Sequence, residues 1–253
     1  MNPTVPEKVV QDAYERDAAS AAAEFGAEFR TDIAGFLDRG IVDAAIDSGV
    51  QVRPPIEGVR YIAFADPSGG ARDAFTVGIA HAENGTAVLD AVFERRPPFN
   101  PATVVAEIRD FLRSYRISSV VGDRYGAAWV TTAFAQVGVR YTHSRRDRSA
   151  IYLDALPLFT SGRVRLIDNP RLAAQLASLE RRTSPGGRDR VDHGPGGHDD
   201  LANAAAGAIT LATAPSQTAP IVEPIIVRID TVDRWSNDDA AMTYSHYMAS
   251  IGR

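Results

Sequence analysis

Three consecutive apolar runs between residues 60 and 96 constrain the fold of this chain more than any other feature. They read "RYIAFAD" (60–66), "AFTVGIAHA" (74–82) and "TAVLDAVFERR" (86–96). Each run is short and bounded by polar or turn-forming residues, which is typical of strands. An Asn-Gly pair at 84–85 separates the second run from the third, and this dipeptide favours a tight hairpin turn. The three runs therefore predict an antiparallel meander.

Helical and strand-like segments alternate after this meander. Residues 101–116, for example, carry apolar side chains at the spacing of one helix face. The expected elements are a helix over 101–116, a strand over 117–123, a helix over 127–138, a strand over 139–144, a helix over 147–162, a strand over 163–167, a helix over 169–182 and a last helix from about His198. Three antiparallel strands followed by this alternation predict an α/β protein with a ribonuclease H-like mixed sheet, flanked by helices.

The sequence changes character on both sides of this predicted domain, which spans residues 60–213. Residues 1–59 are acidic and helical in character, with few β-branched runs, and predict a helical linker segment. Residues 214–253 are first Pro-rich and then strand-like, which predicts a tail and makes it a candidate partner-binding segment.

Four aspartates lie where such a fold would bring them together. Asp66 ends the first strand, Asp123 ends the fourth, and Asp199 and Asp200 open the last helix within "GGHDD". The first and fourth strands of a ribonuclease H-like sheet are neighbours and the last helix packs nearby, so the four carboxylates should converge at one edge. Like charges in a buried crevice repel one another unless a cation offsets them. We therefore expect a positive group at this site.

The chain contains no cysteine, so a metal would be held by oxygen and imidazole ligands, which suit Mg²⁺ or Mn²⁺. Two such ions could clamp the attacking water and the leaving oxygen of a phosphodiester. This chemistry makes four residues the candidate metal ligands and catalytic residues: Asp66, Asp123, Asp199 and Asp200. His198 is a weaker candidate, as a partner of a ligand or a proton carrier, and His193 is weaker still.

The two adjacent aspartates should differ in role, because consecutive helical residues point about 100° apart. Asp200 is one turn before Asn203 on a strip of small residues that could pack on the sheet, so we expect Asp200 to face the strand ends. Asp199, next to the "GPGG" loop, is expected at the rim of the site.

Each aspartate also has a purely structural interpretation. Asp66 precedes "PSGG", which is a turn-forming stretch, and Asp123 could pair with Arg124. Asp199 or Asp200 could serve only as a helix cap, which is a frequent use of aspartate at that position. The joint placement of all four favours the functional interpretation.

Positive charge is concentrated in one part of a chain whose formal net charge is −5. Residues 140–190 contain eleven arginines against five acidic residues. Three of these arginines, Arg145, Arg146 and Arg148, follow the fifth expected strand and are candidates for contacts with DNA phosphates. A solvated basic surface is the alternative interpretation.

Four stretches resemble the C-terminal part of a tailed-bacteriophage terminase large subunit, over about residues 1–212. They are "NPTVPEKVVQDAYERDAASAAAEFGAEFR", "YIAFADPSGG", "VVGDRYGA" and "VDHGPGGHDDLANAAAGA". The resemblance implies a nuclease domain that cuts concatemeric viral DNA with two divalent ions, held by Asp66, Asp123, Asp199 and Asp200. It also implies double-stranded DNA as substrate, the portal protein and small terminase subunit as partners, and the cytoplasm of the bacterial host as location.

Residues 1–59 resemble the junction between the ATPase and the nuclease of that family. The ATPase motor itself is not expected in this chain, because its phosphate-binding loop needs a lysine after glycines. The sole lysine, Lys8, is within "PEKVV" and follows no such loop.

Three other functions are compatible with parts of the pattern. A junction resolvase or transposase core would share the metal chemistry and differ in substrate. A sugar-kinase or actin-like ATPase also uses an aspartate near glycines, but the chain is short for two duplicated domains and has no second phosphate loop. A module that docks on terminase partners without catalysis is the third. No apolar run is long enough to cross a membrane, so no membrane partner is expected.

Overall fold

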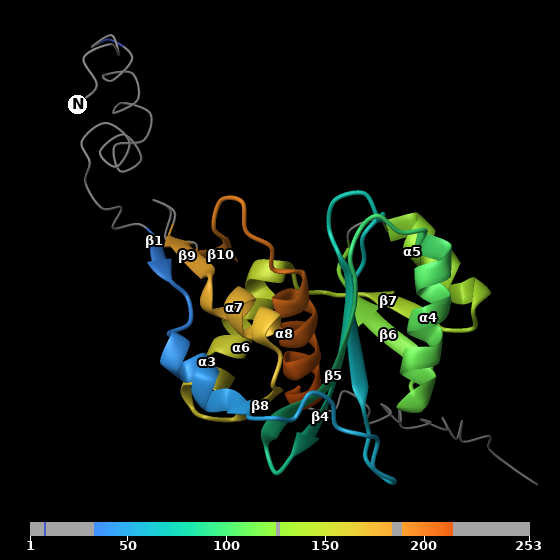
Figure 1. The fold of residues 1–253 in the computed structure, drawn as a ribbon, viewed down its shortest axis with the longest axis horizontal. Coiled ribbons are helices and arrows are strands. Elements are labelled where there is room, and N and C mark those ends of the chain that lie inside the picture. The colour runs from blue at the N-terminus through green and yellow to red at the C-terminus, as the bar shows by residue number, and fades with distance from the viewer. Residues whose placement is uncertain (1–7, 9–32, 125–126, 184–188, 215–253) are drawn as a thin grey trace, which may run out of the picture. The chain divides into compact units, whose positions relative to one another are not determined.

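The computed structural model describes Lys8 and residues 33–124, 127–183 and 189–214 (Figure 1). The chain divides into two compact units, Met1–Ala214 and Pro215–Arg253, and every described residue belongs to the first. Residues 215–253 of the predicted tail, and all of residues 1–32 except Lys8 in the helical segment predicted over 1–59, therefore lie outside the described residues.

A seven-stranded mixed sheet forms the centre of the fold, in the order β2-β8-β5-β4-β3-β6-β7. Its strands are β2 (Ile46–Asp47), β3 (Ile62–Asp66), β4 (Phe75–Glu83), β5 (Thr86–Arg95), β6 (Ser119–Gly122), β7 (Arg140–His143) and β8 (Val164–Ile167). The first three long strands pair antiparallel, and β6 then pairs parallel with β3. This confirms the meander and the predicted adjacency of the first and fourth expected strands.

Helices cover both faces of the sheet (Figure 1). One face carries α4 (Pro101–Ser114) and α5 (Ala127–Gln136), and the other carries α3 (Arg39–Ala45), α6 (Arg148–Thr160), α7 (Pro170–Ala177) and α8 (Asp200–Thr213). Alternation along β4 serves both cores, since Val77 and Ile79 pack on the α4 side while Ala80 belongs to the α8 side. The structure is thus the predicted ribonuclease H-like mixed sheet flanked by helices.

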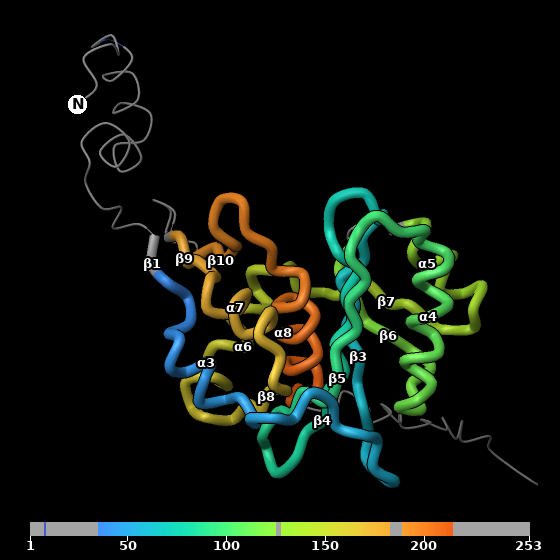
Figure 2. The backbone as a smooth tube through the Cα atoms, in the orientation of Figure 1, coloured from blue at the N-terminus to red at the C-terminus, as the bar shows by residue number. Residues whose placement is uncertain are grey.

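Helix α8 packs unusually close to the sheet, and Figure 2 shows its backbone alongside β4 and β5. A Cβ atom added to Gly78 of β4 would lie 2.6 Å from the carbonyl oxygen of Ala204. A Cβ added to Gly207 of α8 would lie 2.3 Å from the ring of Phe64. Glycine at these two positions permits the close approach, which carries the start of α8 to the end of β3.

A second, three-stranded sheet differs from the sequence prediction. It contains β1 (Ile33–Gly35), β9 (Leu179–Thr183) and β10 (Asp189–His193), in the order β1-β9-β10. The helix predicted over 169–182 in fact ends at Ala177, and the residues after it pair antiparallel with β10. Leu179 and Val191 are buried in the core beneath this pairing, so strand contacts with distant residues override the local helical pattern.

The described part of residues 1–59 joins the fold rather than forming only a helical linker. Strand β2 extends the central sheet by pairing parallel with β8. The backbone N–H of Arg53 then donates a 2.8 Å hydrogen bond to the carbonyl oxygen of Asp90, in β5, and its guanidinium contacts Asp47. Residues 46–53 are therefore part of the domain whose start was predicted at residue 60.

Candidate active site

Asp66 and Asp123 lie side by side because the strands that carry them are parallel neighbours. Ala65 of β3 is in register with Gly122 of β6, and the backbone N–H of Asp123 donates a 3.1 Å hydrogen bond to the carbonyl oxygen of Ala65. Both carboxylates therefore lie at the same edge of the sheet, as predicted.

Asp200 reaches the same edge from the first position of α8. The hydroxyl of Thr76 donates a 2.7 Å hydrogen bond to the carbonyl oxygen of Asp200, and Thr76 is directly opposite Asp66 in the β3–β4 ladder. The backbone N–H of Ala74 donates a weaker 3.4 Å bond to the Asp200 carboxylate. Burial raises the pKa of that carboxyl above its ordinary value.

A cleft of about 260 Å³ opens between these elements. It is lined by Asp66, Pro67, Asp73, Ala74, Arg148, His193, Gly197, His198, Asp199 and Asp200. Three of the four predicted aspartates, and both candidate histidines, thus share one cleft. Asp123 is beside it, where Asn203 Nδ2 lies 3.5 Å from its carboxylate.

Asp66 has the most perturbed environment of the four. Its side chain is 6% exposed, and its Oδ2 atom accepts no hydrogen bond within the described part of the chain. The pKa of Asp66 is raised to about 7, mainly by burial and to a smaller extent by the charges of Asp200 and Asp123, while Arg148 and a hydrogen bond from Asn203 oppose the shift. A buried carboxylate oxygen without a partner is costly unless a cation or proton compensates it.

Asp199 was predicted at the rim of the site, but it is buried, with 2% of its surface exposed. Its Oδ1 accepts a 3.0 Å bond from Arg148 Nη1, and its Oδ2 accepts a 2.9 Å bond from the hydroxyl of Tyr152. Both donors come from α6, which packs on α8. The "GPGG" loop does not carry Asp199 outward, because this packing draws it inward.

Asp199 occupies the cap position of α8, but its side chain caps no backbone N–H group. Gln175 of α7 caps the start of α8 instead. Its Oε1 atom accepts from the backbone N–H groups of Leu201 at 2.8 Å and Ala202 at 3.1 Å. The Asp199 carboxylate is therefore available to α6, and the capping interpretation does not account for it.

The three candidate DNA-contact arginines lie in different environments. Arg145 is exposed in the loop after β7. Arg146 makes two 2.8 Å bonds to the carboxylate of Asp154. Arg148 points instead into the cleft, and although burial lowers its pKa, the Asp199 and Asp66 carboxylates raise the pKa of Arg148 above its ordinary value.

The donors suit a hard divalent cation in their chemistry. Carboxylate oxygens are its preferred ligands, and the buried oxygens Asp66 Oδ2 and Asn203 Oδ1 have no hydrogen-bond partner among the described residues. Within the described ranges, however, no three acidic or histidine side chains are grouped closely enough to hold one ion. Arg148 supplies the positive group that the sequence predicts beside the four aspartates.

Comparison with solved structures places this arrangement in a known fold. The nuclease of the large terminase from thermophilic phage G20c matches with a TM-score of 0.56 and 16% identity, over 68% of this chain and 94% of that one. Its magnesium-bound structure matches with a TM-score of 0.57, 17% identity, and coverage of 67% and 94%. This chain and the G20c nuclease share one fold. It is the ribonuclease H-like fold of large terminase nucleases.

The HK97 bacteriophage large terminase matches with a TM-score of 0.57 and 17% identity, over 84% of this chain. This chain spans about half of that terminase, 52% of its length. No protein-family model and no curated protein sequence matches the chain. The structural comparison therefore carries the likeness to terminase nucleases.

Sequence reasoning missed three polar residues at the site. Asp73 lines the cleft, and its charge contributes to the raised pKa of Asp200, after the larger effect of burial. The chain turns after Asp66 and returns antiparallel from the same edge of the sheet. The predicted meander could therefore have indicated that Asp73 lies at the site. Asn203, one turn beyond Asp200, carried a helical-spacing signal. Tyr152 carried none, because only the packing of α6 on α8 brings it to Asp199.

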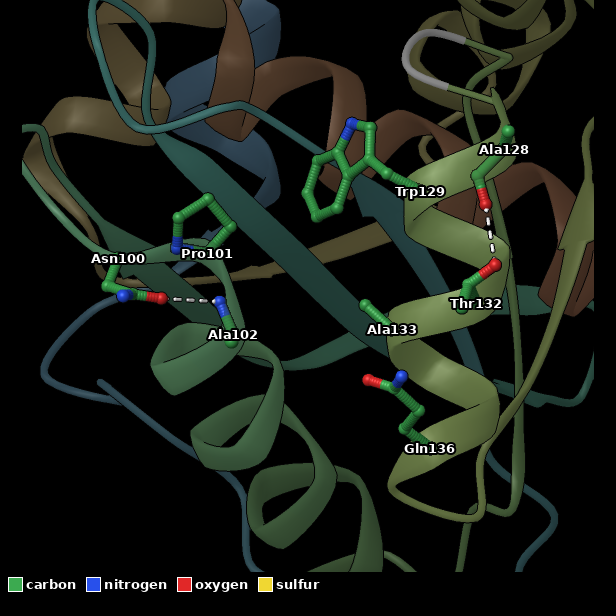
Figure 3. A pocket seen from close by; sticks show the side chains of 8 residues that line it. All are labelled: Asn100, Pro101, Ala102, Ala128, Trp129, Thr132, Ala133 and Gln136. Atoms are coloured by element: carbon green, nitrogen blue, oxygen red, sulfur yellow. Dashed lines mark hydrogen bonds between the residues drawn. The ribbon is translucent and has the colours of Figure 1, made fainter.

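A larger hollow of about 610 Å³ lies elsewhere, between the start of α4 and one face of α5 (Figure 3). It is lined by Asn100, Pro101, Ala102, Ala128, Trp129, Thr132, Ala133 and Gln136. None of these lining side chains is ionisable, so they offer no acid, base or anionic metal ligand. Hydrolytic chemistry is therefore better supported at the smaller carboxylate cleft.

Proposed function

We propose that this chain is a metal-dependent DNA endonuclease, the nuclease part of a terminase large subunit that cuts concatemeric viral DNA during genome packaging. The observation that carries the proposal is the convergence of Asp66, Asp123 and Asp200 at one edge of a sheet with the fold of terminase nucleases. The G20c nuclease has been solved with bound magnesium, which supports divalent-ion chemistry for this fold.

Asp66, Asp123 and Asp200 would hold the Mg²⁺ or Mn²⁺ ions, of which we propose two. Bound there, the ions would supply Lewis-acid stabilisation and an activated water for phosphodiester hydrolysis. Asp199 was also predicted to be a ligand, but both of its oxygens already accept hydrogen bonds from α6. Its role in this proposal is to hold Arg148.

The protein's own groups prepare the site around these ligands. Thr76 fixes the first residue of α8 against the sheet, and Asn203 donates toward Asp123 and so orients it. His198 is exposed at the cleft, close enough for its charge to act on Asp200, and its proposed role is to carry a proton to or from the reacting phosphate.

DNA would approach across the exposed loop that carries Arg145 and Arg146. Contacts from these side chains to phosphates would position the duplex without reading its sequence. The portal protein and small terminase subunit are the proposed partners, and the cytoplasm of the bacterial host is the proposed location. No helix in the described part of the chain has the length and apolar character needed to span a membrane.

Cleavage of supercoiled plasmid tests the proposal. Wild-type protein should nick and linearise the plasmid with Mg²⁺ or Mn²⁺ and lose this activity in excess EDTA. Asp66→Asn should be inactive, whereas the matched control Asp110→Asn, at an exposed acid of α4 outside the cleft, should cleave normally. Undiminished cleavage in EDTA would refute the proposal. Cleavage confined to four-way junctions would instead favour a resolvase.

A further inference from the structure

Helix α6 presents two donors to a single carboxylate. Arg148 and Tyr152 are four residues apart and so lie on one face of the helix. Arg148 Nη1 lies 3.0 Å from Asp199 Oδ1, and the hydroxyl of Tyr152 lies 2.9 Å from Asp199 Oδ2. Asp199 is 2% exposed and Tyr152 is 1% exposed, so a buried carboxylate binds the Nη1 end of the Arg148 guanidinium.

The same guanidinium extends over the other acids. Its Nε atom lies 4.0 Å from Asp123 Oδ2, and Arg148 lines the same cleft as Asp66 and Asp200. The Arg148 side chain is nonetheless 35% exposed, unlike the buried Asp199 to which it is bound. Solvent therefore reaches the Arg148 side chain, although the acid that it binds is buried.

We propose that Arg148 is a built-in counter-ion of the carboxylate cleft, which neutralises the acids when no divalent ion is bound and weakens the binding of such ions until it moves aside. The inference rests on the proposed function, since it concerns the same cleft. It makes Arg148 a positioning residue that acts through the acids and not a catalytic residue.

Two opposite effects distinguish a counter-ion from an arginine that serves only structure. Removing a counter-ion leaves the acids to repel one another and should destabilise the protein without metal. The same removal takes away a positive charge close to the incoming ion, so metal binding should become tighter. A merely structural arginine would leave the affinity for metal unchanged or lower it, because the ligands would lose their positions.

The full 253-residue chain carrying Arg148→Gln tests this directly, with Mn²⁺ as the probe. Calorimetry should show a dissociation constant for Mn²⁺ at least about threefold lower than that of wild type. The melting temperature in EDTA should fall by roughly 5 °C. The matched control Arg39→Gln, whose arginine pairs with Asp43 in α3 outside the cleft, should change neither value. An unchanged or raised dissociation constant in a folded Arg148→Gln protein would overturn the inference.

A second measurement uses the wild-type protein, in case Arg148→Gln does not fold. The NMR signal of the Arg148 side-chain Nε–Hε group, assigned by its loss in Arg148→Lys, is followed during titration with Mg²⁺. A shift of this signal at saturation supports the inference, and an unmoved signal overturns it. Wild-type protein that binds neither Mn²⁺ nor Mg²⁺ would refute the proposed function, whereas normal binding with an unmoved signal refutes only the role of Arg148.

Discussion

The hydroxyl of Thr76 donates a 2.7 Å hydrogen bond to the carbonyl oxygen of Asp200, a residue 124 positions further along the chain. Thr76 is fully buried in β4 and lies opposite Asp66 in the ladder. One side chain therefore ties the start of α8 to the strand that carries the most perturbed carboxylate. This tie is the structural reason why two distant acids share a cleft.

Replacing Thr76 with valine should loosen this tie at nearly constant volume. The lost hydrogen bond should lower the free energy of unfolding by about 1 to 2 kcal/mol. Metal affinity should fall roughly tenfold, because the support of a ligand is removed. Calorimetric titration with Mn²⁺ checks this, with Thr132→Val as control, since the Thr132 hydroxyl bonds only within its own helix among the contacts described. Equal effects in both variants would contradict the role of Thr76.

The raised pKa of Asp66 predicts a pH-dependent stability in the absence of metal. The folded protein keeps the Asp66 proton up to about pH 7, whereas the unfolded chain loses it near 3.8. Between these values the folded state binds more protons, so stability falls as pH rises through this window. Asp66→Asn removes the ionisation, and its gain in unfolding free energy should therefore grow between pH 4 and pH 7.

This gain should reach about 4 kcal/mol at most, from three pKa units at 1.36 kcal/mol each. Urea unfolding in EDTA at pH 5 and pH 8 measures it. Asp154→Asn is the control, because that exposed acid is outside the cleft. The same gain for Asp66→Asn at both pH values would show that Asp66 is not buried with an elevated pKa.

Asp199 and Asp200 should respond differently to the same substitution. Asp199→Asn weakens the buried bond to Arg148, so the melting temperature in EDTA should fall by several degrees. Asp200→Asn removes one charge from a repulsive cluster, so it should keep or raise the melting temperature while reducing cleavage more than about 100-fold. Thermal scans paired with plasmid assays separate the two. A large loss of stability in Asp200→Asn would reverse the assignment.

Salt dependence tests whether the loop before α6 engages DNA. Arg145→Ala should reduce the slope of log affinity against log salt by about one unit, as expected for one lost phosphate contact. Arg146→Ala should have a smaller effect, because Asp154 already neutralises that side chain. Fluorescence anisotropy with a duplex at several salt concentrations provides both slopes. An unchanged slope for Arg145→Ala would leave the arginines as a solvated surface.

The sheet and most of its acids were predictable from sequence because their signals are local or follow from strand order. The apolar runs and the Asn-Gly turn predicted the meander. The alternation after it predicted the neighbouring strands, and therefore the approach of Asp123 to Asp66. The position of Asp200 followed from the small residues of the last helix.

The remaining features depend on contacts between distant residues, for which no local pattern exists. The bond from Arg148 to Asp199 joins residues 51 positions apart, and Gln175 caps a helix that begins 25 residues later, at Asp200. The buried position of Asp199 follows from these two contacts, and the prediction that it is at the rim failed for that reason. Strand β9 could not be predicted from its local pattern either. Its pairing with β1 and β10 favours a strand where the local sequence favours a helix.

The most direct test of the carboxylate cleft is an anomalous difference map from crystals of this chain grown with Mn²⁺. The account predicts at least one peak in contact with the carboxylates of Asp66 and Asp200, and none there in crystals of Asp66→Asn. A map from wild-type crystals saturated with Mn²⁺ that shows no peak in this cleft would contradict the claim that these acids form a metal-dependent nuclease site.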